Sequence, residues 1–239
     1  MKTRSALSRM LILALLALAA IGCSPWTGAV APPPADPHPS RSTPAGVVHR
    51  MEWDWQHLDA ADYATLLTGD FRFVPAAGDS AGSGWSEGTP WNREIERLVA
   101  MRMFDPAPSA PPSVSDLVLN FDRTLISLPD TRPGKNPRWH RSIRTHVDLR
   151  VEMDVGGGDL DLQIIVGNAL FYLVRGDSAR LTANQQWEGA TNDSTQWWIE
   201  RWEDETLEYG GFAQSPTPTQ TRTWAAIKMY FLPSRLAPR

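Results

Sequence analysis

The chain has 239 residues, of which eleven are tryptophan, four are tyrosine and one is cysteine. Without its first 22 residues it carries 20 Lys and Arg against 27 Asp and Glu, because three of the 23 basic residues lie in that segment. This acidic balance argues against a nucleic acid or an anionic lipid surface as a partner. The single cysteine rules out a disulfide within the chain.

The N-terminal segment has the pattern of a secretory signal. Basic residues at positions 2, 4 and 9 precede the apolar run Met10–Ile21. This run of about a dozen residues is shorter than the ~20 that a membrane-spanning helix needs. It therefore indicates a signal that is cleaved rather than a retained anchor.

The sequence Ala20-Ile21-Gly22-Cys23 at the end of this run resembles the lipobox of bacterial lipoproteins. The resemblance implies that residues 1–22 are a lipoprotein signal peptide and that acyl chains such as palmitate bind Cys23 to a membrane. Ser24 rather than aspartate follows, which in such lipoproteins favours the outer membrane over the inner one. We therefore expect a lipid-anchored protein of the cell envelope. The alternative is an ordinary secretory signal that contains a cysteine by chance.

Residues 23–45 are expected to form a tether behind the lipidated cysteine. Seven prolines lie in this stretch among alanine, serine and glycine. Such a composition has too few apolar side chains to pack and is typically extended. The tether would hold a folded domain, expected over residues 46–235, away from the membrane.

Three helices are predicted in the first part of this domain. The first has apolar residues at spacings of three and four. Asp59 can cap the second, and Thr89 can cap the third with Pro90 at its first position. The apolar positions of these helices are Val48, Met51, Trp55 and Leu58; then Tyr63, Leu66 and Leu67; then Ile95, Leu98, Val99 and Met103.

Alternating apolar and polar residues predict strands at 71–74, 117–122, 147–155, 160–164, 168–175 and 197–202. Gly156-Gly157-Gly158 is expected to join two of them in a hairpin. The residues expected to face the core from this hairpin are Val147, Leu149, Val151, Met153 and Val155, then Leu160, Leu162 and Ile164. Asp161 and Gln163 would point outward, so that neither inner face offers an acid or a base. Residues 224–231 fit a strand or a helix equally well.

Helices followed by antiparallel strands predict an α+β fold, with N-terminal helices packed on a curved, mainly antiparallel sheet. This order, with the junction Tyr63–Phe73 between the second helix and the first strand, resembles the NTF2-like superfamily of SnoaL-like and ketosteroid-isomerase-like domains. The resemblance implies a cystatin-like cone, in which the sheet wraps round a long helix and leaves a pocket at the open end. Members include small-molecule isomerases, dehydratases and cyclases, and also non-catalytic binding modules.

Two sequence patterns resemble a catalytic motif and a metal site, but neither is expected to have that role. Gly78-Asp79-Ser80-Ala81-Gly82 matches a nucleophile elbow, but glycine and serine follow it where that motif needs a helix, so a loop is expected. His140 and His146 share a strand face but lie about 20 Å apart, too far to bind one ion. We expect no metal site and no cofactor.

The segment Trp197–Trp202 contains the best candidate for catalysis. In a regular strand Trp198, Glu200 and Trp202 share one face, and a carboxylate between two indoles has a raised pKa suited to proton transfer. Tyr63 could add a phenolic donor, and Tyr63, Trp198 and Trp202 could line the pocket. The alternative is that Glu200 pairs with a basic residue on a neighbouring strand.

These patterns together predict a membrane-anchored, non-catalytic module that binds a small apolar ligand or an envelope protein. The alternative function is a small-molecule lyase or isomerase of SnoaL or ketosteroid-isomerase type that uses Glu200 and Tyr63. A homodimer through the outer face of the sheet is left open, because charged residues of the strand at 147–155 would cover that face.

Overall fold

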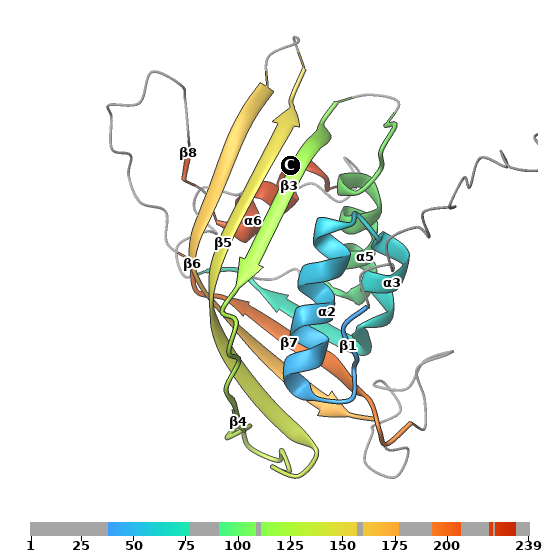
Figure 1. Cartoon of the computed structure of the whole chain (residues 1–239), viewed down its shortest axis with the longest axis vertical. Coiled ribbons are helices and arrows are strands. Elements are labelled where there is room, and N and C mark those ends of the chain that lie inside the picture. Colours follow the sequence, from blue (N-terminus) through green and yellow to red (C-terminus); the bar gives the residue numbers. More distant parts are fainter. Residues whose placement is uncertain are drawn as a thin grey trace, which may run out of the picture. The chain divides into compact units, whose positions relative to one another are not determined.

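The computed structural model describes residues 38–76, 91–108, 111–156, 160–176, 193–206, 220–221 and 223–232 (Figure 1). Residues from His38 onward belong to one compact unit. The expected signal peptide, Cys23 and residues 24–37 of the tether lie outside the described residues. So do the Gly78–Gly82 motif and the last two glycines of the expected hairpin turn.

The first two helices begin where the sequence predicts them, but the second ends earlier than predicted, because Leu66 is its C-cap and Leu67 already begins the first strand. Helix α2 (Pro44–Gln56) begins after Thr43, whose side chain accepts a hydrogen bond from the Gly46 amide. Helix α3 (Ala60–Thr65) begins after Asp59, which caps the Asp62 amide as expected. The fold takes in residues 38–45 as well, which composition alone assigned to the tether. The backbone carbonyl of Arg41, for example, accepts a hydrogen bond of 2.9 Å from the Trp197 amide.

The third helix starts later than the sequence predicts. Trp91–Asn92 form a short strand, β2, opposite Arg72 and Phe73 of β1 (Leu67–Val74). The backbone is therefore extended until Asn92, which caps helix α5 (Arg93–Met103) by accepting a hydrogen bond from the Ile95 amide. The cap is thus Asn92. The expected cap, Thr89, and the expected first helical residue, Pro90, lie outside the described residues.

The remaining strands form one sheet with β1 and β2. They are β3 (Ser113–Phe121), β4 (Ser127–Pro129), β5 (His140–Asp154), β6 (Leu160–Arg175), β7 (Trp197–Asp204) and β8 (Gln220–Thr221). The strand order is β2-β1-β7-β6-β5-β3, with β4 paired to β5 and β8 to β6. Only the β1–β7 and β6–β8 pairs among these are parallel. Figure 1 shows α2, α3 and α5 together on one side of this curved sheet, which confirms the predicted α+β fold class.

The β5–β6 hairpin is confirmed, but its second strand faces the opposite way from the prediction. Val151 of β5 lies opposite Gln163, and Leu149 opposite Ile165, so the odd-numbered residues of β6 face the core. Gln163 is fully buried, whereas Leu160 is 57% exposed. A shift of one residue in hairpin register exchanges the two faces of a strand. The inner face therefore does carry polar groups, since the Gln163 amide donates to the Asp161 carboxylate at 2.6 Å.

A β-bulge corrects the expected faces of β7. Leu173 of β6 pairs with Ile199, and the preceding residue of β6 pairs with Arg201, which leaves Glu200 as the extra residue. Ile199 and Trp202 consequently both belong to the hydrophobic core. The prediction that Trp198, Glu200 and Trp202 share one face is wrong, because the bulge reverses the alternation between positions 199 and 202.

The C-terminal segment is a helix, α6 (Trp224–Tyr230), capped by the Thr223 hydroxyl, which accepts from the Ala226 amide. Trp224 and Lys228 are four residues apart and lie on its buried face. The Trp224 ring packs against Trp55 of α2 and Trp202 of β7, with centroid distances of 4.8 and 4.6 Å. The Trp224 side chain of α6 therefore packs between the first helix and the sheet.

Candidate functional site

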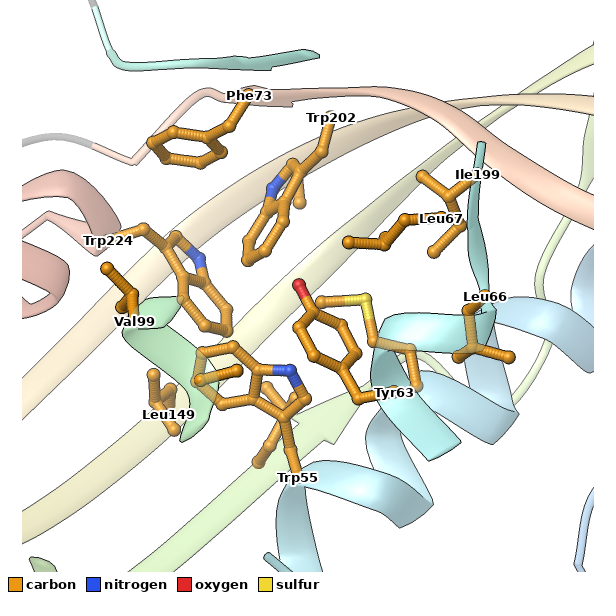
Figure 2. Packing of buried hydrophobic residues seen from close by; sticks show 14 of the residues in the cluster. Trp55, Tyr63, Leu66, Leu67, Phe73, Val99, Leu149, Ile199, Trp202 and Trp224 are labelled. Atoms are coloured by element: carbon orange, nitrogen blue, oxygen red, sulfur yellow. The ribbon is translucent and has the colours of Figure 1, made fainter. Parts of the chain in front are cut away.

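Aromatic side chains occupy the space between the helices and the sheet, where the NTF2-like resemblance implies a pocket. Figure 2 shows Trp55, Tyr63, Phe73, Trp202 and Trp224 converging there from five different elements. Neighbouring rings pack edge to face at centroid distances between 4.6 and 6.3 Å. All five side chains are buried. The interior is thus filled by the protein's own side chains at this position.

A polar cluster lies inside this aromatic core and joins Tyr63, Trp91, Glu96 and Lys228. The Tyr63 hydroxyl and the Trp91 indole N–H donate to the two oxygens of Glu96 at 2.6 and 2.7 Å. The Lys228 ammonium lies 2.8 and 3.0 Å from the same two oxygens. Glu96 is 1% exposed and Lys228 is completely buried. The carboxylate is therefore satisfied on both oxygens, as a buried charge requires.

Burial changes the acid–base properties of this cluster. It lowers the pKa of Lys228 to about 8, although the neighbouring Glu96 carboxylate acts to raise it. Burial and Glu96 together raise the pKa of Tyr63 well above its usual value. At neutral pH the lysine is therefore charged and the phenol is protonated. Each group has its partner inside the cluster, so the arrangement is complete without a bound molecule.

The sequence patterns did not point to Glu96 or Lys228 as site residues, although each is a charged residue in an otherwise apolar setting. Glu96 lies on the buried face of α5 beside Ile95 and Val99, so that it is a charge next to an apolar stripe. Lys228 is the lone charge in the otherwise apolar run 224–231. Each charge is costly alone, and only the tertiary structure shows that the two neutralise each other.

Glu200, the expected catalytic carboxylate, pairs with cations of the segment between β4 and β5. It forms ion pairs with Lys135 and with Arg132, the latter at 3.3 Å, and His140 Nε2 lies 3.9 Å away. Arg132 also binds Asp130 at 2.7 Å. The carboxylate is 7% exposed. Glu200 therefore belongs to an ion-pair network. This is close to the alternative that it pairs with a basic residue of a neighbouring strand, except that its partners come mainly from a loop.

The structure does not bring the other expected site residues together with Glu200. The hydroxyl of Tyr63 bonds to Glu96. Trp202 packs in the aromatic core, whereas the ring of Trp198 lies under the Arg41 guanidinium, 5.5 Å from its centroid. Tyr63 and Trp202 therefore both lie in the aromatic core, whereas Trp198 and Glu200 have their contacts elsewhere.

A second buried acid lies between α2 and α3. The Asp54 carboxyl group lies beside another acid, Asp62, to which it can hydrogen-bond when protonated. The Nε of Arg50 lies 3.6 Å from Asp54 and binds Asp62 at 2.6 Å. Burial and the neighbouring Asp62 raise the pKa of Asp54 to about 9. This carboxyl group is therefore neutral at pH 7.

The surface beside α5 contains an open depression of about 400 Å³. Its lining is polar and consists of Gly69, Asp70, Arg72, Asn92, Arg93 and Glu94.

Within the described ranges, no three or more His, Cys, Asp or Glu side chains are grouped to hold a metal ion. None of the described helices has both the length and the apolar character needed to cross a membrane.

Comparisons with known proteins give likeness in structure alone. No family model and no curated protein sequence matches the chain. A solved structure from Novosphingobium aromaticivorans, provisionally named an aromatic ring hydroxylase, has 14% identity and a TM-score of 0.46 over 73% of this chain and 94% of its own. A second from that organism, provisionally named a scytalone dehydratase, has 10% identity and a TM-score of 0.42 over 72% and 87%.

A third similar structure is an NTF2-like superfamily protein from Salmonella enterica, with 9% identity and a TM-score of 0.39 over 71% of this chain and 92% of that protein. Likenesses this weak say nothing about the chemistry of this chain. The described elements, with helices on one face of a curved, mainly antiparallel sheet (Figure 1), agree with the α+β fold class expected from the order of elements.

Proposed function

We propose that this chain is a lipid-anchored protein of the cell envelope whose NTF2-like domain is a non-catalytic binding module. Its partner is then an envelope protein rather than a small apolar ligand. The observation that carries the proposal is the filled interior, where Trp55, Tyr63, Trp202, Trp224 and Lys228 are fully buried in mutual contact. A partner that binds this domain would use its surface.

The lyase or isomerase alternative loses its geometric support. It needs Glu200 and Tyr63 in one pocket, yet Glu200 pairs with Lys135 and Arg132 while Tyr63 donates to Glu96. General acid–base catalysis requires the acid and the base within hydrogen-bond reach of the same substrate. The two candidates have separate partners instead.

The anchor rests on the lipobox-like sequence before Cys23. The proposed spacer is residues 24–37, which precede the compact unit that begins at His38. Fourteen residues with five prolines would reach about 40 Å if extended at ~3.1 Å per residue. Such a spacer would let the domain meet a partner beyond the lipid headgroups.

Metabolic labelling with a palmitate analogue tests the anchor in the full-length chain. Wild type should be labelled and should partition into the membrane fraction, whereas Cys23→Ala should be neither labelled nor retained there. Ser24→Ala is the matched control and should behave as wild type. Equal labelling of wild type and Cys23→Ala would overturn the anchoring.

Native mass spectrometry tests the non-catalytic role separately. The domain of residues 38–239, expressed in its host without the tether, should show the mass of the polypeptide alone. A small molecule bound at one copy per chain would contradict a filled interior and would revive the small-molecule hypotheses, whatever the labelling shows.

A further inference from the structure

The ammonium group of Lys228 lies within an enclosure of aromatic rings. Its Nζ is 3.6 Å from the ring centroid of Trp202 and 3.8 Å from that of Phe73, and it is 5.8 Å from both Trp91 and Trp224. All four distances fall within the ~6 Å over which a ring face attracts a cation. We call these four rings, together with the carboxylate of Glu96, the ammonium cage.

Most of the ammonium cage is built by elements other than the helix that carries Lys228. Phe73 comes from β1, Trp91 from β2, Glu96 from α5 and Trp202 from β7, so that α6 contributes Trp224 alone. The rings also hold one another. Phe73 packs edge to face on Trp91 and on Trp202, with centroid distances of 5.4 and 5.0 Å.

The carboxylate of the ammonium cage is likewise positioned without the lysine. Tyr63 and Trp91 each donate a hydrogen bond to it, which fixes where its two oxygens point. Its remaining acceptor capacity is directed at Nζ, 2.8 and 3.0 Å away. Ring faces attract a cation, and hydrogen bonds between an ammonium group and a carboxylate are stronger than neutral ones, so both features favour an ammonium group at this position.

The geometry selects one class of cation. Two short N–H···O contacts require hydrogens on the nitrogen, which a quaternary ammonium lacks. The side chain of Lys228 reaches the ammonium cage through an unbranched methylene chain. The site therefore fits a primary ammonium group at the end of a straight alkyl chain.

We propose that the ammonium cage is a binding site for primary alkylammonium groups, and that Lys228 occupies it as an intramolecular ligand carried by α6. A ligand amine would enter only where the lysine side chain has left. This inference goes beyond the proposed envelope function and does not depend on the lipid anchor, since it concerns the compact unit that begins at His38.

Chemical rescue of Lys228→Ala in residues 38–239 tests the proposal. The substitution removes three methylene groups and the ammonium, and n-propylammonium replaces these atoms one for one. The melting temperature of Lys228→Ala should fall below that of wild type and rise saturably with millimolar n-propylammonium chloride. Propan-1-ol and sodium chloride at equal concentration should give less than a tenth of that rise.

Two further variants make the rescue specific. Lys228→Met fills the ammonium cage with an apolar chain of similar length and should not respond to the amine. Glu96→Gln combined with Lys228→Ala should bind the amine at least about tenfold more weakly, because a charge-assisted hydrogen bond is lost. If Lys228→Ala does not fold unaided, its soluble yield on refolding with the amine, against propan-1-ol, becomes the measurement.

Several results would overturn the proposal. Equal rescue by propan-1-ol would mean an apolar cavity without ammonium recognition. A response of Lys228→Met would mean binding elsewhere. A lack of response in Lys228→Ala, whether as melting temperature or as refolding yield, would mean that the ammonium cage accepts only its own lysine.

Discussion

The buried pair of Glu96 and Lys228 can be tested by a double-mutant cycle. In Glu96→Gln the ammonium keeps its aromatic neighbours but loses the carboxylate 2.8 Å away. In Lys228→Met the carboxylate keeps the hydrogen bonds from Tyr63 and Trp91, and the thioether occupies the space of the lysine chain. The double variant removes both charges at once.

Removal of one partner of a buried ion pair costs about 3–5 kcal/mol, whereas removal of both is often nearly neutral. Glu96→Gln should lie at the upper end of this range, because its single carbonyl oxygen cannot accept from Tyr63, Trp91 and Lys228 together. Lys228→Met should lie near about 3 kcal/mol, because two donors still serve the carboxylate. The double variant should cost less than the sum of the single variants by at least about 2 kcal/mol.

Equilibrium unfolding of residues 38–239 in urea at pH 7, followed by tryptophan fluorescence, gives these free energies by linear extrapolation. Glu94→Gln is the matched control. Glu94 pairs with Arg97 at the surface of the same helix. Loss of this exposed pair should cost less than about 0.5 kcal/mol.

The pair also has a pH signature. Burial lowers the pKa of Lys228 from 10.5 to about 8, so between these values the unfolded chain binds more protons than the native chain. Stability due to this lysine is therefore full above pH 10.5 and is lost as the pH falls through 8. The stability of wild type relative to Lys228→Met should rise by roughly 2 kcal/mol between pH 8 and pH 10. Additive single variants, or a difference that does not change with pH, would refute the reasoning.

Three further predictions concern other parts of the molecule. Asp54→Asn should have a higher melting temperature than wild type, by a margin that grows from pH 5 to pH 9. The reason is that the Asp54 carboxyl stays protonated up to about pH 9 in the native protein but ionises near 3.8 in the unfolded chain, so that wild type loses stability as the pH rises. A margin that does not change with pH would contradict this. Glu200→Gln should cost about 1–3 kcal/mol in urea unfolding and Glu203→Gln less than about 0.5, and equal costs would argue against the ion-pair network. Gly46→Ala should lower the melting temperature by several degrees, because its new Cβ would lie 1.9 Å from the Ser40 carbonyl oxygen; an unchanged melting temperature would place residues 38–45 outside the folded unit.

Local rules were sufficient for the starts of the first two helices and for strand β5. Asp59 caps the second helix as its sequence position predicts. Val147, Leu149, Val151 and Met153 are all fully buried, because strict alternation leaves one assignment of faces. In these segments the pattern of apolar residues is complete within a few residues of sequence.

The sequence was insufficient where a neighbouring strand decides the outcome. Residues 160–174 are apolar on both faces, so their pattern fits two registers and only pairing with β5 selects one. The bulge at Glu200 depends in the same way on pairing with β6. The candidate site could not be predicted, because Glu96 and Lys228 are 132 residues apart and neither explains its burial without the other.

The first residues of the folded unit determine how a pull on the proposed tether would reach the domain. The His38 ring packs on Trp53 at 3.7 Å, the Pro39 carbonyl accepts from Arg50, and the Arg41 carbonyl accepts from the Trp197 amide of β7. Strand β7 lies between β1 and β6, in the middle of the sheet. Force from a membrane anchor would therefore first load these contacts and the central strand, before it could unwind α2. The domain would therefore resist unfolding under such a force through the sheet rather than through a single helix.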